Sequence, residues 1–296
     1  MSSTTNPNQK PPTTPEEFKS IQKDNWNTVA QGWKRWWNTF EHGAQTLSDR
    51  LVDLANVKPD DKILDIATGI GKPAVTAAKK MKHKGQVIAI DMSSEMLAIA
   101  QERAQKLGLN DIVTFIESDA ESYSYPTSEF NAVLSRWAIM LFPNFVTTMQ
   151  KIHRSLTSEG RIVAAVWSNS SKAPMLAVPY RIIAKAVGIV PPLTPGSMGA
   201  FRFSDSAMLQ DSVTQAGFRN IKTEKMNVTF TFNSVEEYIE FEKSTAGGMI
   251  VTMLKNLPKE TQQQLWNSIA DEIRGYSDKN GSLKLTNEVI IVSANG

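Results

Sequence analysis

The chain has 296 residues, of which 41% are hydrophobic and 21% are charged, a balance typical of ordinary globular proteins. It contains no cysteine, which excludes disulfides, thiolate metal sites and cysteine nucleophiles. The formal net charge of +2 gives no basic excess, so no nucleic-acid partner is expected, and three widely spaced histidines predict no metal site.

The N-terminal part of the chain predicts a tail followed by a helical cap. Residues 1–15 are polar and rich in proline, and they predict a disordered tail without the apolar core of a signal peptide. Residues 16–57 predict the cap, which carries Trp33 and Trp36 as candidates for an apolar substrate pocket. Its other tryptophans are expected to anchor the cap. An amphipathic helical pattern covers Leu47 to Ala55.

An α/β pattern occupies residues 58–170. Strands are predicted at 63–67, 86–91, 113–118, 132–135 and 161–167, and helices at 73–81, 94–107 and 144–156. Most of these strands are continuously apolar, as in a parallel sheet that helices cover on both faces.

The remaining residues, 171–296, predict further strands of the sheet with helical insertions that cover a substrate. The expected helices are 174–187, 205–216 and 234–276, the loop is Pro191–Gly196, and the strands are 220–232 (one strand or a pair) and 288–293. No apolar run is long enough to cross a bilayer, so a cytoplasmic protein is the simplest expectation.

The most informative stretch is Lys62 to Gly71, which reads as a strand running into a glycine turn, with Asp91 ending the next strand. Glycines let the backbone approach a nucleotide-like ligand, and a carboxylate accepts hydrogen bonds from ribose hydroxyls. A pyrophosphate fits poorly, because Ala67 stands at the first glycine position and Lys72-Pro73 where a third glycine could stand. Asp65 suits the ammonium of a methionine group, so the turn favours S-adenosylmethionine over a dinucleotide.

Five segments occur in a recognisable order over residues 60 to 170. They are Leu64–Gly71, Val87–Leu97, Glu117–Glu121, Phe130–Trp137 and Leu156–Val163. With them the chain resembles the class I S-adenosylmethionine-dependent methyltransferases of the small-molecule type, such as the ubiquinone and menaquinone biosynthesis C-methyltransferases (methyltransferase type 11 domain). This resemblance implies the Rossmann-like methyltransferase fold: a doubly wound, mostly parallel seven-stranded sheet with an N-terminal helical cap and a C-terminal helical insertion.

The resemblance also implies roles for residues at the strand tips. The implied cofactor residues are Asp65, Ala67, Gly69, Ile70 and Gly71 at the methionine group, Asp91 at the ribose, Met92, Asp119 and Ala120 at the adenine, and Ser135 near the methyl donor. Arg136 and Trp137 would face the substrate. Plain structural alternatives remain: Asp91 capping the helix that starts at Ser94, Asp119 as a turn residue, and Arg136 paired with a surface carboxylate.

Methyl transfer from a sulfonium is an in-line displacement, so the protein mainly positions the reactants, and a general base is needed only if the acceptor must lose a proton. The candidate bases are His42 and Tyr180. The apolar cap and helical insertions predict a small apolar or aromatic acceptor: a quinone-like ring, a phenolic metabolite or a lipid. Three alternatives stay open, namely a nucleotide-linked Rossmann oxidoreductase, a cofactor-binding protein without turnover, and a methyltransferase acting on RNA or protein. The sequence does not specify the oligomeric state.

Overall fold

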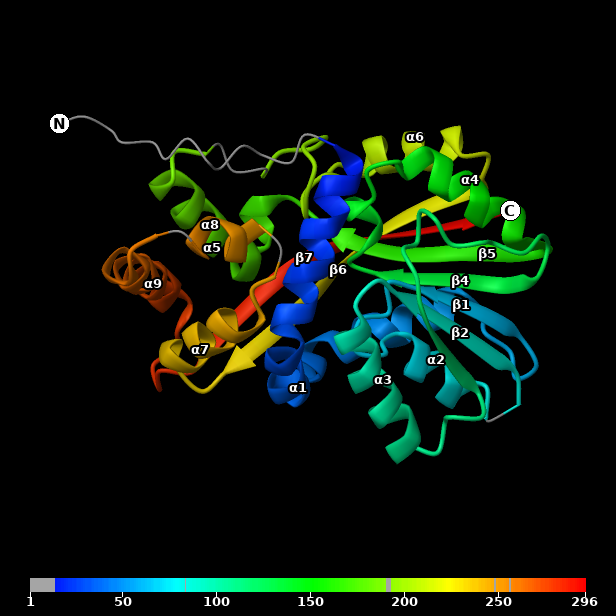
Figure 1. Ribbon diagram of the computed structural model, residues 1–296, viewed down its shortest axis with the longest axis horizontal. Coiled ribbons are helices and arrows are strands. Elements are labelled where there is room, and N and C mark those ends of the chain that lie inside the picture. The colour runs from blue at the N-terminus through cyan, green and yellow to red at the C-terminus, as the bar shows by residue number, and fades with distance from the viewer. Residues whose placement is uncertain (1–13, 83, 190–192, 248, 256) are drawn as a thin grey trace.

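The computed structural model describes residues 14–82, 84–189, 193–247, 249–255 and 257–296. The expected disordered tail at residues 1–15 lies almost wholly outside the described residues, and the expected loop Pro191–Gly196 lies partly outside them. The described residues form a seven-stranded sheet with helices around it, in the order β3-β2-β1-β4-β5-β7-β6 (Figure 1).

The sheet is mostly parallel. Its strands are β1 Lys62–Ile66, β2 Gln86–Asp91, β3 Val113–Glu117, β4 Phe130–Arg136, β5 Leu156–Trp167, β6 Arg219–Phe232 and β7 Leu283–Asn295. Strands β3, β2, β1, β4 and β5 pair in parallel, and β7 runs antiparallel between β5 and β6. The expected fold class is confirmed. The region expected as one strand or a pair is the single strand β6.

The helices cover both faces of the sheet. They are α1 Pro15–Leu54, α2 Ala74–Lys80, α3 Ser94–Lys106, α4 Phe145–Ser155, α5 Pro174–Ala186, α6 Ser206–Gln215, α7 Val235–Thr245, α8 Met249–Lys255 and α9 Lys259–Ile273. From β1 to β2 the chain moves toward one edge of the sheet, and from β4 to β5 toward the other. Right-handed crossovers therefore put α2 on one face and α4 on the opposite face (Figure 1). The reversal between β1 and β4 is the switch point at which doubly wound sheets bind ligands.

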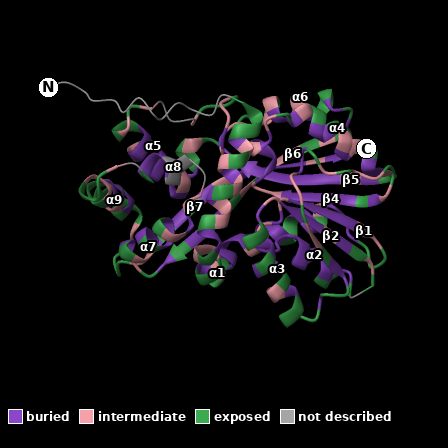
Figure 2. Ribbon diagram, in the orientation of Figure 1, coloured by how far each residue is buried: buried purple, intermediate pink, exposed green. Residues whose placement is uncertain are grey.

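The central strands are buried on both faces, as their continuous apolar composition requires. Ile63, Leu64 and Ile66 of β1 have no exposed surface, and the middle of the sheet is buried along β1, β4 and β5 (Figure 2). This rigid core fixes where each strand tip ends.

Helix α1 is one continuous helix of 40 residues, so the two helical patterns in the cap belong to a single element. It begins at the N-cap Thr14, whose Oγ1 accepts a hydrogen bond from the Glu17 amide at 3.1 Å. Gly43 lies in its interior, where a Cβ would come within 2.5 Å of the Thr229 carbonyl oxygen of β6. The missing side chain at Gly43 thus lets α1 lie directly against the sheet.

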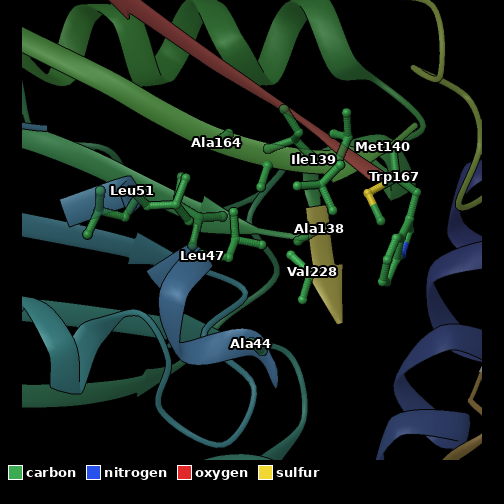
Figure 3. Close-up of a cluster of buried hydrophobic side chains, with 14 of the residues drawn as sticks. Ala44, Leu47, Leu51, Ala138, Ile139, Met140, Ala164, Trp167 and Val228 are labelled. Atoms are coloured by element: carbon green, nitrogen blue, oxygen red, sulfur yellow. The ribbon is translucent and has the colours of Figure 1, made fainter. Parts of the chain in front are cut away.

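The C-terminal half of α1 is part of the hydrophobic core. Leu47 and Leu51 have no exposed surface and pack with Ile139 and Ala164, close to the tip of β4 (Figure 3). Burying a leucine side chain of this kind stabilises a fold by about 1.5–3 kcal/mol. The buried half therefore holds the N-terminal half of α1 in position across the strand tips.

The C-terminal helical insertion supports α1 from the other side. Helices α7 to α9 lie between β6 and β7 in the chain and gather with α5 beyond α1 (Figure 1). The Trp33 indole donates a hydrogen bond to the Thr245 carbonyl oxygen at 3.2 Å. The rings of Trp33 and Trp36 meet Phe241 edge-on, with centroids 6.2 and 6.0 Å away. Helix α7 thus fixes the rotation of α1 about its own axis.

A glycine in α1 tests this contact. Glycine to alanine in a helix ordinarily stabilises by about 0.5–1 kcal/mol. At Gly32, however, a Cβ would lie 1.8 Å from the Ser244 carbonyl oxygen. We expect Gly32→Ala to lower the free energy of unfolding by about 1–3 kcal/mol, measured by urea denaturation. Gly275→Ala is the control, because no atom lies within 4 Å of its Cβ position. A Gly32→Ala variant as stable as the wild type would contradict the packing of α1 on α7.

Candidate active site

A cavity lies at the carboxyl ends of β1 to β4, under the N-terminal half of α1. Its described lining comes from α1 and from the segments that directly follow these strands, within residues 67–72, 91–96, 118–121 and 136–143. None of the described lining residues comes from α5, α6, α7, α8 or α9. In the described structure the cavity is therefore covered by α1 and not by these helices.

The structure brings most of the predicted site residues together around this cavity. Those that line it are Ala67, Gly69, Ile70, Asp91, Met92, Asp119 and Ala120 from the predicted cofactor set, and Trp33, Arg136 and Trp137 from the predicted substrate side. They come from four strand tips and one helix, which the switch point of the sheet places side by side.

The turn after β1 exposes its backbone to the cavity. Ala67 and Gly69 adopt the left-handed conformation, with φ of 54° and 55°. No atom lies within 4 Å of the place where a Gly69 Cβ would stand, so a ligand can approach that backbone. Gly71 also has a positive φ, of 97°, and in addition its Cβ would lie 3.2 Å from the Ala100 side chain of α3.

Asp65 lies behind this turn and does not line the cavity. Its Oδ2 accepts hydrogen bonds from Thr68 Oγ1 at 2.6 Å and from the Ala74 amide at 2.8 Å, while its buried Oδ1 has no partner. Complete burial raises the pKa of Asp65 to about 7, although the two hydrogen bonds and the positive Arg136 act in the opposite direction. A positive charge above the turn would ionise this carboxyl group.

Asp91 joins the tips of β1 and β2. Its Oδ2 accepts a hydrogen bond from the Gly69 amide at 2.8 Å, and its Oδ1 accepts one from the Ser93 amide at 2.9 Å. Burial raises the pKa of Asp91, and the backbone hydrogen bonds offset part of this effect. The N-cap of α3 is Ser93, whose Oγ accepts from the Met96 amide, so Asp91 is not needed as the cap.

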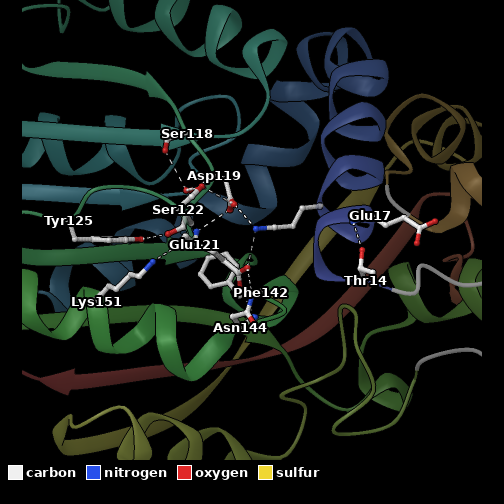
Figure 4. A network of polar contacts seen from close by, with 12 residues as sticks. Thr14, Glu17, Ser118, Asp119, Glu121, Ser122, Tyr125, Phe142, Asn144 and Lys151 are labelled. Carbon is white, nitrogen blue, oxygen red and sulfur yellow. Dashed lines mark hydrogen bonds and ion pairs between the residues drawn. The ribbon is translucent and has the colours of Figure 1, made fainter.

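Asp119 and Glu121 carry a polar network at the tip of β3 (Figure 4). Lys19 of α1 donates to Asp119 Oδ2 at 2.8 Å and lies 3.4 Å from Glu121. Partial burial acts to raise the pKa of Asp119, but the hydrogen bonds from Lys19 and from the Glu121 amide outweigh it, and the pKa falls below its ordinary value. This ion pair ties the N-terminal half of α1 to the sheet.

Arg136 pairs with a buried carboxylate rather than with a surface one. Its Nη2 lies 2.6 Å from Glu41 Oε1 of α1, and its Nη1 donates to Ser48 Oγ at 2.8 Å. Only 8% and 9% of the Arg136 and Glu41 side chains are exposed. Arg136 still lines the cavity, with its charge paired with Glu41.

Trp137 closes the same end of the cavity in an unusual backbone conformation. Its φ is 61°, which a bulky residue rarely adopts and which is often found at functional sites. The indole stacks on Trp167 with ring centroids 4.6 Å apart, and its buried Nε1 has no partner. Its amide still donates to the Ala165 carbonyl oxygen at 2.8 Å.

Several predicted residues do not lie in the cavity wall. Ser135 is fully buried, and its Oγ donates to the Ile66 carbonyl oxygen at 3.1 Å, which ties β4 to β1. Trp36 lies about 60° around α1 from Trp33 and packs on α7 instead. His42 is exposed on α1, and Tyr180 is buried in α5. Neither candidate base is among the described lining residues.

The structure adds residues that sequence reasoning missed. Lys19, Trp26 and Phe40 line the cavity together with the predicted Trp33, and the seven-residue spacing of these four residues places them on one face of α1. This spacing could have identified Trp26. Lys72 also lines the cavity, and no sequence signal distinguished its side chain.

No group of three or more His, Asp or Glu in the described chain could hold a metal ion. None of its helices combines the length and the apolar character needed to cross a membrane.

The sheet order, the reversed β7 and a cavity at the strand tips define an α/β enzyme that binds a nucleoside-containing ligand. Residues 57–185 match the family model described as a methyltransferase domain. The demethylmenaquinone methyltransferase of Thermus thermophilus is 32% identical over 155 residues, which cover 52% of this chain and 69% of that protein. A ubiquinone/menaquinone biosynthesis C-methyltransferase of Allorhizobium ampelinum is 30% identical over 122 residues, which cover 40% of this chain and 47% of that protein.

Solved structures share the fold at low sequence identity. The YcgJ protein of Bacillus subtilis matches with a TM-score of 0.55 and 17% identity, over 84% of this chain and 98% of that one. A Haemonchus contortus phosphoethanolamine N-methyltransferase 2 in complex with S-adenosyl-L-methionine matches with a TM-score of 0.50 and 18% identity, over 89% of this chain and 52% of that one. The chain belongs to the class I S-adenosylmethionine-dependent methyltransferases, and S-adenosylmethionine is its cofactor.

The geometry and the chemical groups of the cavity fit this cofactor, independently of the comparisons. The open backbone at Gly69 suits a close ligand, and Asp91 places a buried carboxylate at the tip of β2. The unpartnered Oδ1 of Asp65 lies behind the turn. An ammonium group on the cavity side of the turn would compensate the negative charge of the ionised carboxyl group. The described cavity thus offers carboxylates and an unobstructed backbone at Gly69, whose amide is already bonded to Asp91, rather than a cradle for a pyrophosphate.

The raised pKa of Asp65 predicts that the free energy of unfolding depends on pH. The folded protein holds this proton more tightly than the unfolded chain, so stability is lost as the pH rises from the unfolded pKa through about 7. Asp65→Asn stays neutral. We expect its free energy of unfolding to gain about 2 kcal/mol relative to the wild type between pH 5 and pH 8, measured by urea denaturation.

The control for this measurement is Asp111→Asn, at an exposed position, whose difference from the wild type should not change with pH. If the difference between Asp65→Asn and the wild type is the same at both pH values, Asp65 is ionised in the folded protein and the account of its burial is wrong.

Proposed function

We propose that the enzyme transfers the methyl group of S-adenosylmethionine to a small apolar or aromatic acceptor. The observation that carries this proposal is the aromatic wall beside the strand tips. It consists of Trp26, Trp33, Phe40, Trp137 and Phe142. Aromatic rings are the side chains that most favour flat apolar ligands in a concave site.

Three rings of this wall are in contact with one another. Trp33 and Phe40 meet edge-on with centroids 4.7 Å apart, and Phe40 and Trp137 lie 5.6 Å apart. These contacts hold the rings in place before a ligand arrives, which lowers the entropy lost on binding. Their faces also attract positive charge, which suits a site beside a sulfonium.

At the donor end, different strand-tip residues would bind different parts of the cofactor. Asp91 would accept hydrogen bonds from the ribose hydroxyls, and Met92 with Asp119 would border the adenine. The ammonium of the methionine group would lie over the turn, where the negative charge of Asp65, buried behind the turn, would attract it through the intervening backbone. The cofactor supplies a methyl group that its sulfonium has already activated.

The chain's own contribution to the reaction is then mainly positioning. Holding the acceptor in line with the methyl group, away from water, can supply about 7–11 kcal/mol of the barrier reduction. The described lining contains no histidine and no tyrosine, so neither His42 nor Tyr180 is proposed as a base. An acceptor that needs little help to lose a proton, such as a quinol or a phenol, fits this site.

The names of the relatives suggest which acceptor to test first. The Thermus thermophilus protein is a demethylmenaquinone methyltransferase, so a quinol ring with a short side chain leads the panel, followed by phenols and a lipid. Transfer of labelled methyl from S-adenosylmethionine to an aromatic acceptor would support the proposal. Binding of S-adenosylhomocysteine without transfer to any apolar or aromatic acceptor would contradict it.

The role of Asp91 can be measured without an acceptor. We expect Asp91→Asn to weaken the binding of S-adenosylhomocysteine by about tenfold to hundredfold, because hydrogen bonds to a charged carboxylate are lost. Calorimetric titration gives the affinity, and Asp111→Asn, an exposed aspartate, is the matched control. Unchanged affinity in Asp91→Asn would remove Asp91 from the cofactor site.

Two tryptophans of α1 separate the acceptor site from the packing of the helix. Both contact α7, but only Trp33 also lines the cavity. We expect Trp33→Leu to raise the KM for the acceptor found in the panel by about tenfold and to leave the affinity for S-adenosylhomocysteine near the wild-type value. Trp36→Leu should lower stability without this change in KM. Equal effects of both variants on KM would contradict the assignment of the aromatic wall.

A further inference from the structure

Gln22 of α1 places a free amide in the wall of the cavity. The residue lines the cavity and is only 8% exposed. Within the described structure its side-chain amide forms no hydrogen bond. Unlike the sealed Oδ1 of Asp65, neither amide atom of Gln22 is enclosed by protein, so the amide is open to the cavity that the residue lines. It offers two N–H donors and one carbonyl acceptor.

The charged groups of the same wall, by contrast, have protein partners. Lys19 donates to Asp119 at 2.8 Å, and Arg136 lies 2.6 Å from Glu41. A buried polar group without a hydrogen bond costs about 1–3 kcal/mol, and such groups in folded proteins nearly always have partners. We therefore expect a ligand to supply the partner of Gln22.

The neighbours of Gln22 on α1 indicate which ligand this is. Phe18 and Trp26 lie one turn before and one turn after Gln22, at spacings of four residues, and both line the cavity. Trp26 belongs to the aromatic wall of the proposed acceptor site. In the proposed function, Asp91 and Asp119 at the strand tips meet the polar edges of the donor. The amide on α1 is therefore left for the acceptor.

The group that binds Gln22 is expected to be uncharged. Lys19, which lies one turn before Gln22, is already held by Asp119 and is 3.4 Å from Glu121, so its charge is compensated. A neutral amide cannot compensate a charge on the ligand, whereas it matches a hydroxyl or a carbonyl group.

We propose that Gln22 determines acceptor specificity by forming a hydrogen bond with an uncharged hydroxyl or carbonyl group at the edge of the acceptor ring. The inference rests on the proposed function and deepens it. Among flat aromatic molecules of one size, the site prefers those whose polar substituent reaches Gln22, because a site with a hydrogen-bonding group discriminates against analogues that leave this group unpaired.

Matched pairs of probes measure this preference without turnover. 1-Naphthol and 2-naphthol are each compared with the methylnaphthalene in which a methyl group replaces the hydroxyl. Equilibrium dialysis gives their affinities for protein saturated with S-adenosylhomocysteine. We expect Gln22→Met, which keeps the length of the side chain and a good helix propensity, to lower the ratio of naphthol to methylnaphthalene affinity by about threefold to tenfold in at least one pair.

The matched control is Gln31→Met, because Gln31 is exposed on α1 and is not among the described lining residues. This variant should leave both ratios at the wild-type values. Circular dichroism checks that the variants are folded, and Gln22→Leu replaces Gln22→Met if the latter does not fold.

Ratios that Gln22→Met leaves unchanged in both pairs would overturn the inference. A tenfold loss of S-adenosylhomocysteine affinity with unchanged ratios would also overturn it, because Gln22 would then contact the donor. Failure of the proposed function looks different. If the wild type binds none of the four probes, the aromatic acceptor site itself is wrong and the inference falls with it, whereas binding that does not depend on Gln22 removes the role of Gln22 alone.

Discussion

Two buried carboxylates hold the turn after β1, and the site depends on them. Asp65 binds Thr68 and the Ala74 amide from behind, while Asp91 binds the Gly69 amide from the tip of β2. These hydrogen bonds hold the left-handed backbone that faces the cavity. Both carboxyl groups are costly to ionise inside the protein, which raises their pKa values. In the proposed binding mode, a ligand that brings an ammonium group and hydroxyls would compensate this cost.

Helix α1 converts this exposed turn into a covered cavity. Its C-terminal half is fixed in the core by residues such as Leu47 and Leu51, and α7 sets its rotation through Trp33 and Trp36. Its N-terminal half therefore presents one face to the strand tips, where Lys19 is tied to Asp119. In the proposed function the sheet turns line the donor end of the cavity, and the aromatic rings of α1 and the β4 tip line the acceptor end. This division would let one scaffold hold a polar cofactor beside an apolar acceptor.

The sequence predicted the parts of the structure that local chemistry determines. Apolar strands, the glycine turn and Asp91 at a strand tip all follow from short patterns, and the sheet places them together. The seven-residue spacing groups Trp26 with Trp33 on one face of α1, but the sequence could not show that this face meets the cavity, because that depends on how the helix packs on α7. For the same reason His42 looked like a candidate base although it is exposed, and Ser135 looked like a cofactor residue although it is buried against Ile66. The buried Lys72 depends on contacts with two helices, so no pattern marked it.

The most direct measurement is a calorimetric titration of S-adenosylhomocysteine at pH 7 in two buffers with different ionisation enthalpies. With a pKa of about 7, Asp65 is about half protonated at this pH. An ammonium bound over the turn lowers that pKa, so binding should release a fraction of a proton, and Asp65→Asn should abolish that release. Absence of S-adenosylhomocysteine binding, or binding with the same proton release in the wild type and in Asp65→Asn, would contradict the account of this site.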